Sequence, residues 1–276
     1  MTQKLTDHSR LCLHTITTKP WSLQQCIDGY NRAGIPAITV WRQALEPQGL
    51  AASAKMLKGS SLRVTSLCRG GFFPAATADG RAKALDDNRK AIEEAHAIGA
   101  PLIVLVCGAV PGIALPEARK MIADGIAAVL PEAQAAGVKL AIEPLHPMYA
   151  NDRSAVNTIR QANDLVQEIG SRQVGVAVDV YHLWWDDTLE QEIRRCGKAG
   201  SLMAFHVCDW LTPTREFLND RGLMGEGCIN ISQIRGWVEA AGFAGDVEVE
   251  IFSTELWQTD QTQFVERIKQ AYLNHV

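Results

Sequence analysis

Short apolar runs alternate along this chain with longer amphipathic stretches, and this alternation limits its fold more than any other feature. The apolar runs predict eight strands, at Leu11–Thr17, Ala37–Trp41, Arg63–Leu67, Leu102–Cys107, Lys139–Glu143, Gly175–Asp179, Met203–Val207 and Val247–Phe252. The clearest helical patterns cover Arg81–Ile98, Pro116–Ala136, Ser154–Ile169, Ile231–Ala241 and Gln261–Tyr272. Strands that alternate with helices in this way predict a parallel sheet with the helices outside it.

The number of predicted strands favours a closed barrel over an open sheet. An open doubly wound sheet usually carries the motif G-x-G-x-x-G after its first strand, and none follows Leu11–Thr17. The 276 residues suit a barrel of eight strand–helix units, which typically takes about 250 residues. We therefore predict an α/β fold in which residues 1–276 form a single (β/α)8 TIM-barrel domain. The polar, glycine-containing segment from Cys208 to Asn230 is expected to cap the barrel mouth.

Composition and charge argue against several classes of protein. The formal net charge is −4, and no block of Lys and Arg is present that would neutralise a nucleic-acid backbone. The longest apolar run, near residues 101–110, is too short to span a membrane, and the N-terminal residues lack the apolar core of a secretory signal. Seven scattered cysteines form no C-x-x-C pair. We expect a cytoplasmic protein with reduced cysteines that binds neither nucleic acid nor a membrane and acts on a small polar molecule.

Each of the last four predicted strands carries near its C-terminal end a side chain that can bind a metal ion, namely Glu143, Asp179, His206 and Glu250. Catalytic groups of such barrels lie at the C-terminal ends of the strands. A single glutamate at a strand end is usually solvated or salt-bridged, and a single histidine usually packs, but four such residues on consecutive strands favour a common site. Three buried carboxylates would repel one another unless protonated or neutralised, and no Lys or Arg ends these strands.

One divalent metal ion would neutralise this ring of side chains. Three carboxylates and one imidazole form a mostly hard set of ligands, which suits Mn, Mg or Co better than a thiolate-type zinc site, although Zn also accepts such ligands. Glu248 points to the same side of its strand as Glu250 but one layer deeper, so it is the alternative ligand there. The sequence therefore predicts a single divalent ion at the barrel mouth.

Several short motifs follow one another in the second half of the chain. Glu143 precedes a proline, Asp179 and His182 form D-x-x-H, and His206 lies in F-H-V. The segment from Asn219 reads N-D-R-G-x-x-G-x-G, and the last strand contains V-E-I-F. In this order and at this spacing, the motifs resemble the sugar phosphate isomerase/epimerase family of the xylose-isomerase-like barrel superfamily, which includes ketose 3-epimerases and inosose-processing enzymes. The resemblance covers most of the chain and is strongest from Glu143 onward.

The resemblance implies a role for each of these positions. It implies that the four strand-end residues bind the metal and that Glu143 and Glu250, on opposite sides of the substrate, also act as the catalytic acid–base pair. It implies that His182 hydrogen-bonds a substrate oxygen and that Arg221 reaches the substrate from the capping segment. Ketose 3-epimerases commonly carry a further glutamate six residues after the first ligand, where this chain has Tyr149. The identity of the substrate therefore stays open.

Four more side chains near strand ends are candidates for substrate contact, namely His146, Trp41, His14 and Trp184. The first would take the place of the missing glutamate, and a tryptophan could pack against the C–H face of a sugar. Ordinary packing is an equally good interpretation of the other three. We interpret Arg69, after the third predicted strand, as a surface residue, with binding of an anionic group as the alternative. The sequence contains no evident phosphate cradle.

The chemistry that best suits these residues is proton transfer next to a carbonyl group. A metal-dependent isomerase or epimerase of a small keto-sugar or cyclitol would move a proton through a metal-stabilised enediolate. The alternative is a lyase or dehydratase that eliminates from a keto-sugar, inosose or 3-keto-glycoside at the same site. Seven histidines and a net charge of −4 disfavour a nuclease of the endonuclease IV type, and a non-enzymatic sugar-binding barrel is the last alternative. A homo-oligomer is compatible with a barrel of this size.

Overall fold

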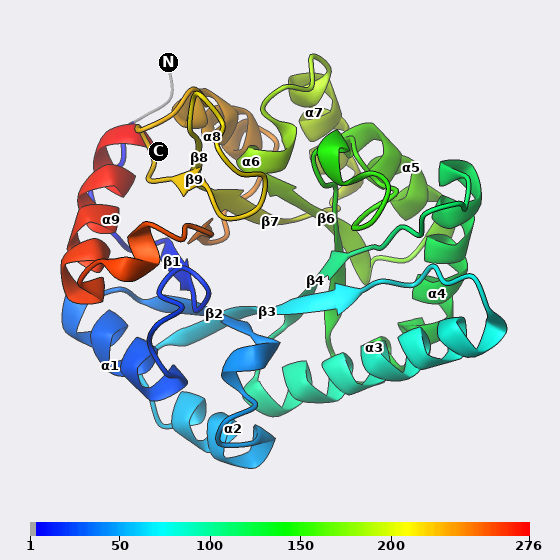
Figure 1. The fold of residues 1–276 in the computed structure, drawn as a ribbon, viewed down its shortest axis with the longest axis horizontal. Helices are drawn as coiled ribbons and strands as arrows, with labels where there is room; N and C mark the ends of the chain where they lie inside the picture. Colours follow the sequence, from blue (N-terminus) through cyan, green and yellow to red (C-terminus); the bar gives the residue numbers. More distant parts are fainter. Residues whose placement is uncertain (1–3) are drawn as a thin grey trace.

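The computed structural model describes residues 4–276, and within them the central element is a closed barrel of eight parallel strands (Figure 1). The strands are β1 (Leu11–His14), β2 (Ala37–Trp41), β3 (Arg63–Gly71), β4 (Leu102–Val106), β5 (Lys139–Glu143), β6 (Val174–Asp179), β7 (Leu202–Val207) and β10 (Val247–Val249). Their order around the barrel is β1-β10-β7-β6-β5-β4-β3-β2, and each pairs in parallel with its neighbours. The predicted α/β barrel is confirmed.

Helices surround the barrel on its outside, as Figure 1 shows. They are α1 (Leu23–Ala33), α2 (Leu50–Lys58), α3 (Ala78–Ile98), α4 (Leu115–Ala135), α5 (Ile159–Ile169), α6 (Val180–Leu183), α7 (Leu189–Ala199), α8 (Ile231–Ala240) and α9 (Gln261–His275), with 3-10 turns η1 (Arg42–Ala44), η2 (Pro147–Tyr149) and η3 (Leu256–Gln258). Local signals set their bounds. Ser22 and Gln25 form a reciprocal capping box at the start of α1. Gly99 ends α3 in the left-handed conformation, with φ 76°.

The capping segment between β7 and α8 is more ordered than its polar, glycine-containing sequence suggests. It contains a two-stranded antiparallel ribbon of β8 (Asp209–Trp210) and β9 (Arg221–Gly222). The carboxylate of Asp209 accepts hydrogen bonds from the backbone N–H groups of Gly225 (2.9 Å) and Ile229 (3.0 Å). These bonds hold the segment in one conformation, and the ribbon fixes the strand that carries Arg221.

Four boundaries differ from the predicted ones in ways that matter for the site. β3 continues to Gly71, so Arg69 lies within a barrel strand and not in a rim loop. α5 begins at Ile159, because the preceding residues run extended beside the barrel, with Ser154 bridged to Gly108. β1 and β10 end several residues earlier than predicted.

Small side chains fill much of the barrel interior. The inner cluster consists of Cys68, Leu102, Val104, Ala141, Ala177 and Ala204, all buried. The larger aromatic side chains, such as Tyr30, Phe205 and Phe264, pack in the main core between the strands and the helices. On β5, β6 and β7, an alanine lies two residues before the ligand-type residue and so faces the same side of the strand. These small side chains leave room above them, at the barrel mouth, for the ligand-type residues.

Two predictions, that the cysteines are reduced and that the protein binds no membrane, can be compared with the structure. The seven cysteines are all free, and six of them are buried, with Cys228 exposed. Among residues 4–276, no helix combines the length and the apolar character that crossing a lipid bilayer requires.

Candidate functional site

Four neighbouring strands bring the predicted ligand-type residues together at the barrel mouth. Glu143 and Asp179 are the last residues of β5 and β6, His206 is the second-last residue of β7, and Glu250 directly follows β10. Asp179 and His206 are partners in the β6–β7 register, and the N–H of Glu250 donates to the carbonyl of Val207 (3.1 Å). One ligand atom from each of the four lies within 4.8 Å of those of the others, and all four side chains are buried. We call this group the carboxylate cluster.

Hydrogen bonds orient the members of the carboxylate cluster. His206 Nδ1 lies 2.9 Å from Glu143 Oε1. Asp179 also caps α6, because its Oδ1 accepts from the backbone N–H of Tyr181 (2.8 Å), which leaves Oδ2 facing the cluster. His14, buried below, places Nδ1 3.0 Å from Glu250 Oε1. Each group is therefore held by a partner that restricts its rotation.

A cation does reach the carboxylate cluster, from a part of the chain that the strand ends did not reveal. Arg221 on β9 is buried, and its Nη1 donates to Glu250 Oε2 (2.7 Å) and to Asp179 Oδ2 (3.2 Å). Its guanidinium lies 4.4 Å from the ring centre of Tyr181 and 4.9 Å from that of Phe252. Arg221, which the resemblance placed at the substrate, therefore supplies the positive charge that the strand ends themselves lack.

The pKa values within the carboxylate cluster are driven apart. Burial raises the pKa of Asp179 to about 7, against the lowering effect of Arg221. Burial also acts to raise the pKa of Glu250, but the charges of Arg221 and His14 outweigh it and hold that pKa well below its ordinary range. Arg221 contacts two of the three carboxylates, Asp179 and Glu250, whereas Glu143 lies against His206.

Glu248, the alternative ligand, lies one layer deeper and has its own partners. Its Oε2 accepts from Thr39 Oγ1 (2.5 Å) and Ser66 Oγ (2.9 Å), and it lies 3.2 Å from His14 Nε2. With three neighbours on one oxygen, Glu248 fixes the imidazole that in turn contacts Glu250. His14, Glu248 and His206 also bring ligand-type atoms within 4.8 Å of one another, so they form a second group that could hold a metal ion.

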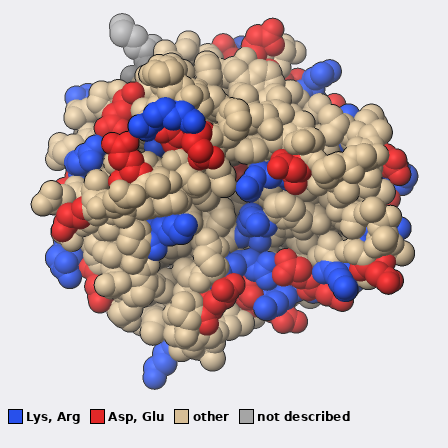
Figure 2. All heavy atoms as spheres, in the orientation of Figure 1, with Lys and Arg blue, Asp and Glu red and all other residues tan. Residues whose placement is uncertain are grey.

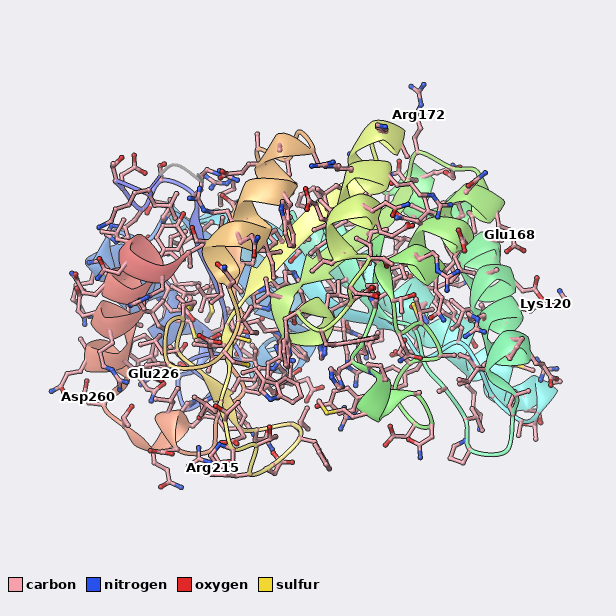
Figure 3. All side chains as sticks on the ribbon, turned by 90° about the horizontal axis from the view of Figure 1, so that it is seen from above. Lys120, Glu168, Arg172, Arg215, Glu226 and Asp260 are labelled. Atoms are coloured by element: carbon pink, nitrogen blue, oxygen red, sulfur yellow. The ribbon has the colours of Figure 1, made fainter. Side chains whose placement is uncertain are left out.

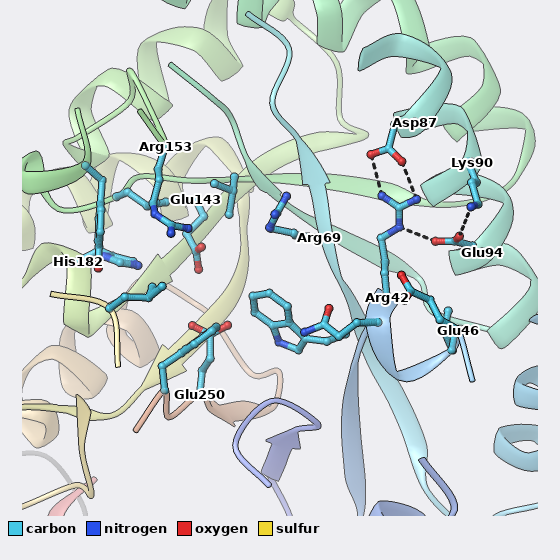
Figure 4. A pocket seen from close by; sticks show the side chains of 18 of the residues that line it. Arg42, Glu46, Arg69, Asp87, Lys90, Glu94, Glu143, Arg153, His182 and Glu250 are labelled. Atoms are coloured by element: carbon cyan, nitrogen blue, oxygen red, sulfur yellow. Dashed lines mark hydrogen bonds and ion pairs between the residues drawn. The ribbon is translucent and has the colours of Figure 1, made fainter. Parts of the chain in front are cut away.

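A cavity of about 820 Å³ opens above the carboxylate cluster. Its wall includes Glu143, Glu250, His182, Arg221 and Trp41, all of them residues proposed from the sequence. Figure 2 shows basic side chains gathered around a hollow at the centre of this face, and Figure 4 shows the cavity from close by. A cavity of this size suits a small molecule.

His182 is held as a neutral imidazole at the edge of the cavity. Burial and the charge of Arg221 lower its pKa well below the ordinary value. The backbone N–H of His146 donates to His182 Nδ1 (3.3 Å), and Nε2 lies 3.3 Å from Arg221 Nη2. Both ring nitrogens thus lie beside N–H donors, and the neutral ring lines the cavity, where it can contact a bound molecule.

Three residues proposed as substrate contacts lie outside the cavity wall. His14 is fully buried below Glu250 and contacts that carboxylate. The His146 ring packs against Trp210, with ring centres 4.9 Å apart, and Trp184 packs against the same tryptophan at 5.7 Å. Both rings thus pack against the capping segment and are not part of the cavity wall.

Other wall residues were missed or misjudged from the sequence. Arg69 lies in the cavity wall, which corrects its interpretation as a surface residue. Arg153 and Tyr149 also line the cavity. The sequence marked Tyr149 only as the replacement for a glutamate of ketose 3-epimerases, and Arg153 stands neither at a strand end nor in a recognisable motif. Arg153 immediately precedes a stretch that was predicted as helix from Ser154 onward, so no sequence signal pointed to its place above β4.

Comparison with known proteins agrees with this architecture. An inosose isomerase of Bacillus velezensis is 24% identical over 277 residues, covering 95% of each chain. The structure of a protein from Sinorhizobium meliloti 1021 is 46% identical, covers 98% of this chain and 99% of its own, and has a TM-score of 0.94. The zinc-bound IOLI protein is 21% identical, with coverage of 96% and 97% and a TM-score of 0.84. The model of the xylose isomerase-like TIM barrel matches residues 28–270, and this chain belongs to that family.

Proposed function

We propose that this protein is a divalent-metal-dependent isomerase or epimerase of a small keto-sugar or cyclitol. The observation that carries the proposal is the convergence of the carboxylate cluster beneath a cavity large enough for a sugar. The isomerase activity named for the Bacillus velezensis relative supports the class of reaction and substrate. The zinc atom in the IOLI protein supports binding of a divalent metal by a barrel of this fold.

The donor set of the carboxylate cluster fits a divalent ion. Carboxylate oxygens from Glu143, Asp179 and Glu250 and a nitrogen of His206 converge within 4.8 Å in a buried position. Such a set suits Mn, Mg or Co, and Zn is also compatible with it. The negative charge that Arg221 leaves uncompensated is a further reason for a cation here. When bound, a divalent ion polarises a carbonyl group and stabilises the negative charge that develops beside it.

Glu143 and Glu250 are the proposed acid–base pair. Both carboxylates line the cavity, and two strands, β6 and β7, separate β5 from β10 in the barrel. The two groups therefore face a bound molecule from different sides. One carboxylate removes a proton from the carbon next to the carbonyl, and the other, in its protonated form, delivers a proton to the opposite face, which inverts that carbon. His182, in the cavity wall, hydrogen-bonds a substrate oxygen.

The first test is metal analysis of the purified protein and its variants. We expect about one equivalent of a divalent metal in the unmodified protein, because the carboxylate cluster offers one buried set of ligands. Glu250→Gln and His206→Ala should each weaken or abolish metal binding, whereas Glu168→Gln, at an exposed glutamate on α5, should retain it. A protein that takes up no metal after incubation with Mn, Mg, Co and Zn would contradict the proposal.

The second test identifies the reaction. Ketoses and inososes are incubated with the metal-loaded protein in deuterated water and followed by NMR. Deuterium incorporated at one carbon, with no loss of water from the molecule, is the expected result. A dehydrated enone would indicate elimination and replace the isomerase proposal with a lyase.

A further inference from the structure

Two arginines line the cavity without an acidic partner. They are Arg69 on β3 and Arg153 in the segment between η2 and α5. Within residues 4–276, neither guanidinium has an ion pair or a hydrogen bond to another group. Figure 4 shows both side chains directed into the cavity that Glu143 and Glu250 also face.

Aromatic rings and the backbone hold these arginines in place. The Arg69 guanidinium lies 4.2 Å from the ring centre of Phe72, and that of Arg153 lies 5.6 Å from the ring centre of Tyr149. The carbonyl of Arg153 accepts a hydrogen bond from the N–H of Gly108 (2.9 Å), just beyond β4, the strand next to β3. Ring contacts of this kind orient a guanidinium but leave its charge and its N–H donors free.

A third arginine in the same cavity differs from these two because it is paired with acidic residues. Arg42 donates two hydrogen bonds to Asp87 (2.8 and 2.9 Å) and one to Glu94 (2.5 Å), and Figure 4 draws these bonds. Two of the carboxylates that line this cavity, Asp87 and Glu94, are therefore already engaged. Arg69 and Arg153 are left as the cavity cations that lack a counter-charge among residues 4–276.

The two unpaired charges act on each other. Burial lowers the pKa of Arg69, and the charge of Arg153 lowers it further. The proposed metal centre does not require them, because a divalent ion together with Arg221 already balances the three carboxylates of the cluster. An anion between the two guanidinium groups would relieve their repulsion, and the planar N–H fork of arginine matches the oxygens of carboxylate and phosphate.

We infer that Arg69 and Arg153 form an oxyanion subsite, so that the substrate is a keto-sugar or cyclitol that carries a carboxylate or a phosphate. The sugar part of this inference rests on the proposed function, whereas the anion subsite rests on the cavity alone. The subsite would hold the charged end of the substrate and so position its carbonyl region over the carboxylate cluster.

The test uses small anions and metal-free protein. Chelator-treated protein is titrated calorimetrically with inorganic phosphate, with malonate as the carboxylate probe, and with uncharged myo-inositol, all at constant ionic strength. We expect saturable binding of at least one anion, weakened about tenfold or more by Arg69→Gln and by Arg153→Gln, since charge-assisted hydrogen bonds are lost. The anion that binds more tightly identifies the charged group of the substrate.

The matched control is Arg172→Gln, which removes the same charge at an exposed position. Figure 3 shows Arg172 at the opposite end of the molecule from Arg215, which belongs to the capping segment at the barrel mouth. It should bind anions like the unmodified protein. Thermal melting of each variant shows whether it folds, and Arg69→Lys, which keeps the charge but loses the fork, should bind with intermediate affinity. Saturation by neither anion, or equal weakening by the Arg172 variant, would overturn the inference. Metal analysis is a separate measurement, so either proposal can fail alone.

Discussion

The two sides of the barrel mouth differ in the sign of their charged side chains and in how these are paired. On the side of β5, β6, β7 and β10, acidic groups from strand ends are buried together, and two of them contact Arg221. On the side of β2, β3 and β4, the cavity wall carries three arginines, one paired with acids and two in contact with aromatic rings. The first side is built to concentrate negative charge around a cation, and the second side leaves positive charge facing the cavity. Under the proposed function and the inferred oxyanion subsite, the first side processes one end of the substrate and the second side holds the other.

The acidic side should show the largest effect on turnover. Glu143→Gln and Glu250→Gln each remove a group that accepts or donates a proton, so each should slow the reaction about 100- to 10,000-fold. The rate of solvent-deuterium incorporation into the substrate measures this loss. Glu168→Gln serves as the surface control, and turnover unchanged in either active-site variant would show that this side does not perform the chemistry.

Loss of Arg221 should have the next largest effect, on stability. In metal-free protein, Arg221→Gln leaves Asp179 and Glu250 without their cation, which should lower the free energy of unfolding by about 3–5 kcal/mol. Added Mn²⁺ should recover much of this loss, because it supplies positive charge to the same carboxylates. Urea unfolding with and without the metal measures both quantities. A variant as stable as the unmodified protein without metal would contradict the proposed charge balance.

Replacing Arg42 tests the contrast between paired and unpaired arginines. Arg42→Gln frees Asp87, whose charge already acts on Arg69. The freed carboxylate should compete with an external anion, so phosphate affinity should fall severalfold, while stability should fall by only about 1 kcal/mol for a partly exposed pair. Calorimetric titration and urea unfolding separate the two effects, and higher phosphate affinity in this variant would refute the assigned role of Arg42.

The smallest effect is expected where the structure places a candidate contact outside the cavity. Trp184→Phe keeps an aromatic ring against Trp210 and should leave KM within about twofold, as is usual for a change away from the site. Trp41→Phe, in the cavity wall, should raise KM by a larger factor, because the indole also donates from Nε1 to His14 Nδ1 (3.2 Å). Steady-state kinetics of both variants tests whether the residues that line the cavity are the ones that contact the substrate.

Much of this molecule could be predicted from its sequence because the relevant signals are local. Alternation of apolar runs with helical patterns specified the parallel barrel, and parallel strands necessarily bring their C-terminal ends to one edge. Glu143, Asp179, His206 and Glu250 could therefore be grouped from their positions in the chain alone. Their joint burial within 4.8 Å follows from that geometry.

Side chains outside the strand ends could not be placed in this way. Arg221 enters the carboxylate cluster because β8 and β9 pair above the mouth, and Arg153 faces the cavity because its segment bridges to the end of β4. His146 and Trp184 pack against Trp210 and do not line the cavity. The direction of such a side chain depends on packing between segments far apart in the chain, which no local period encodes. The sequence thus specifies the barrel and its acidic ring, and long-range packing specifies which cations surround the cavity.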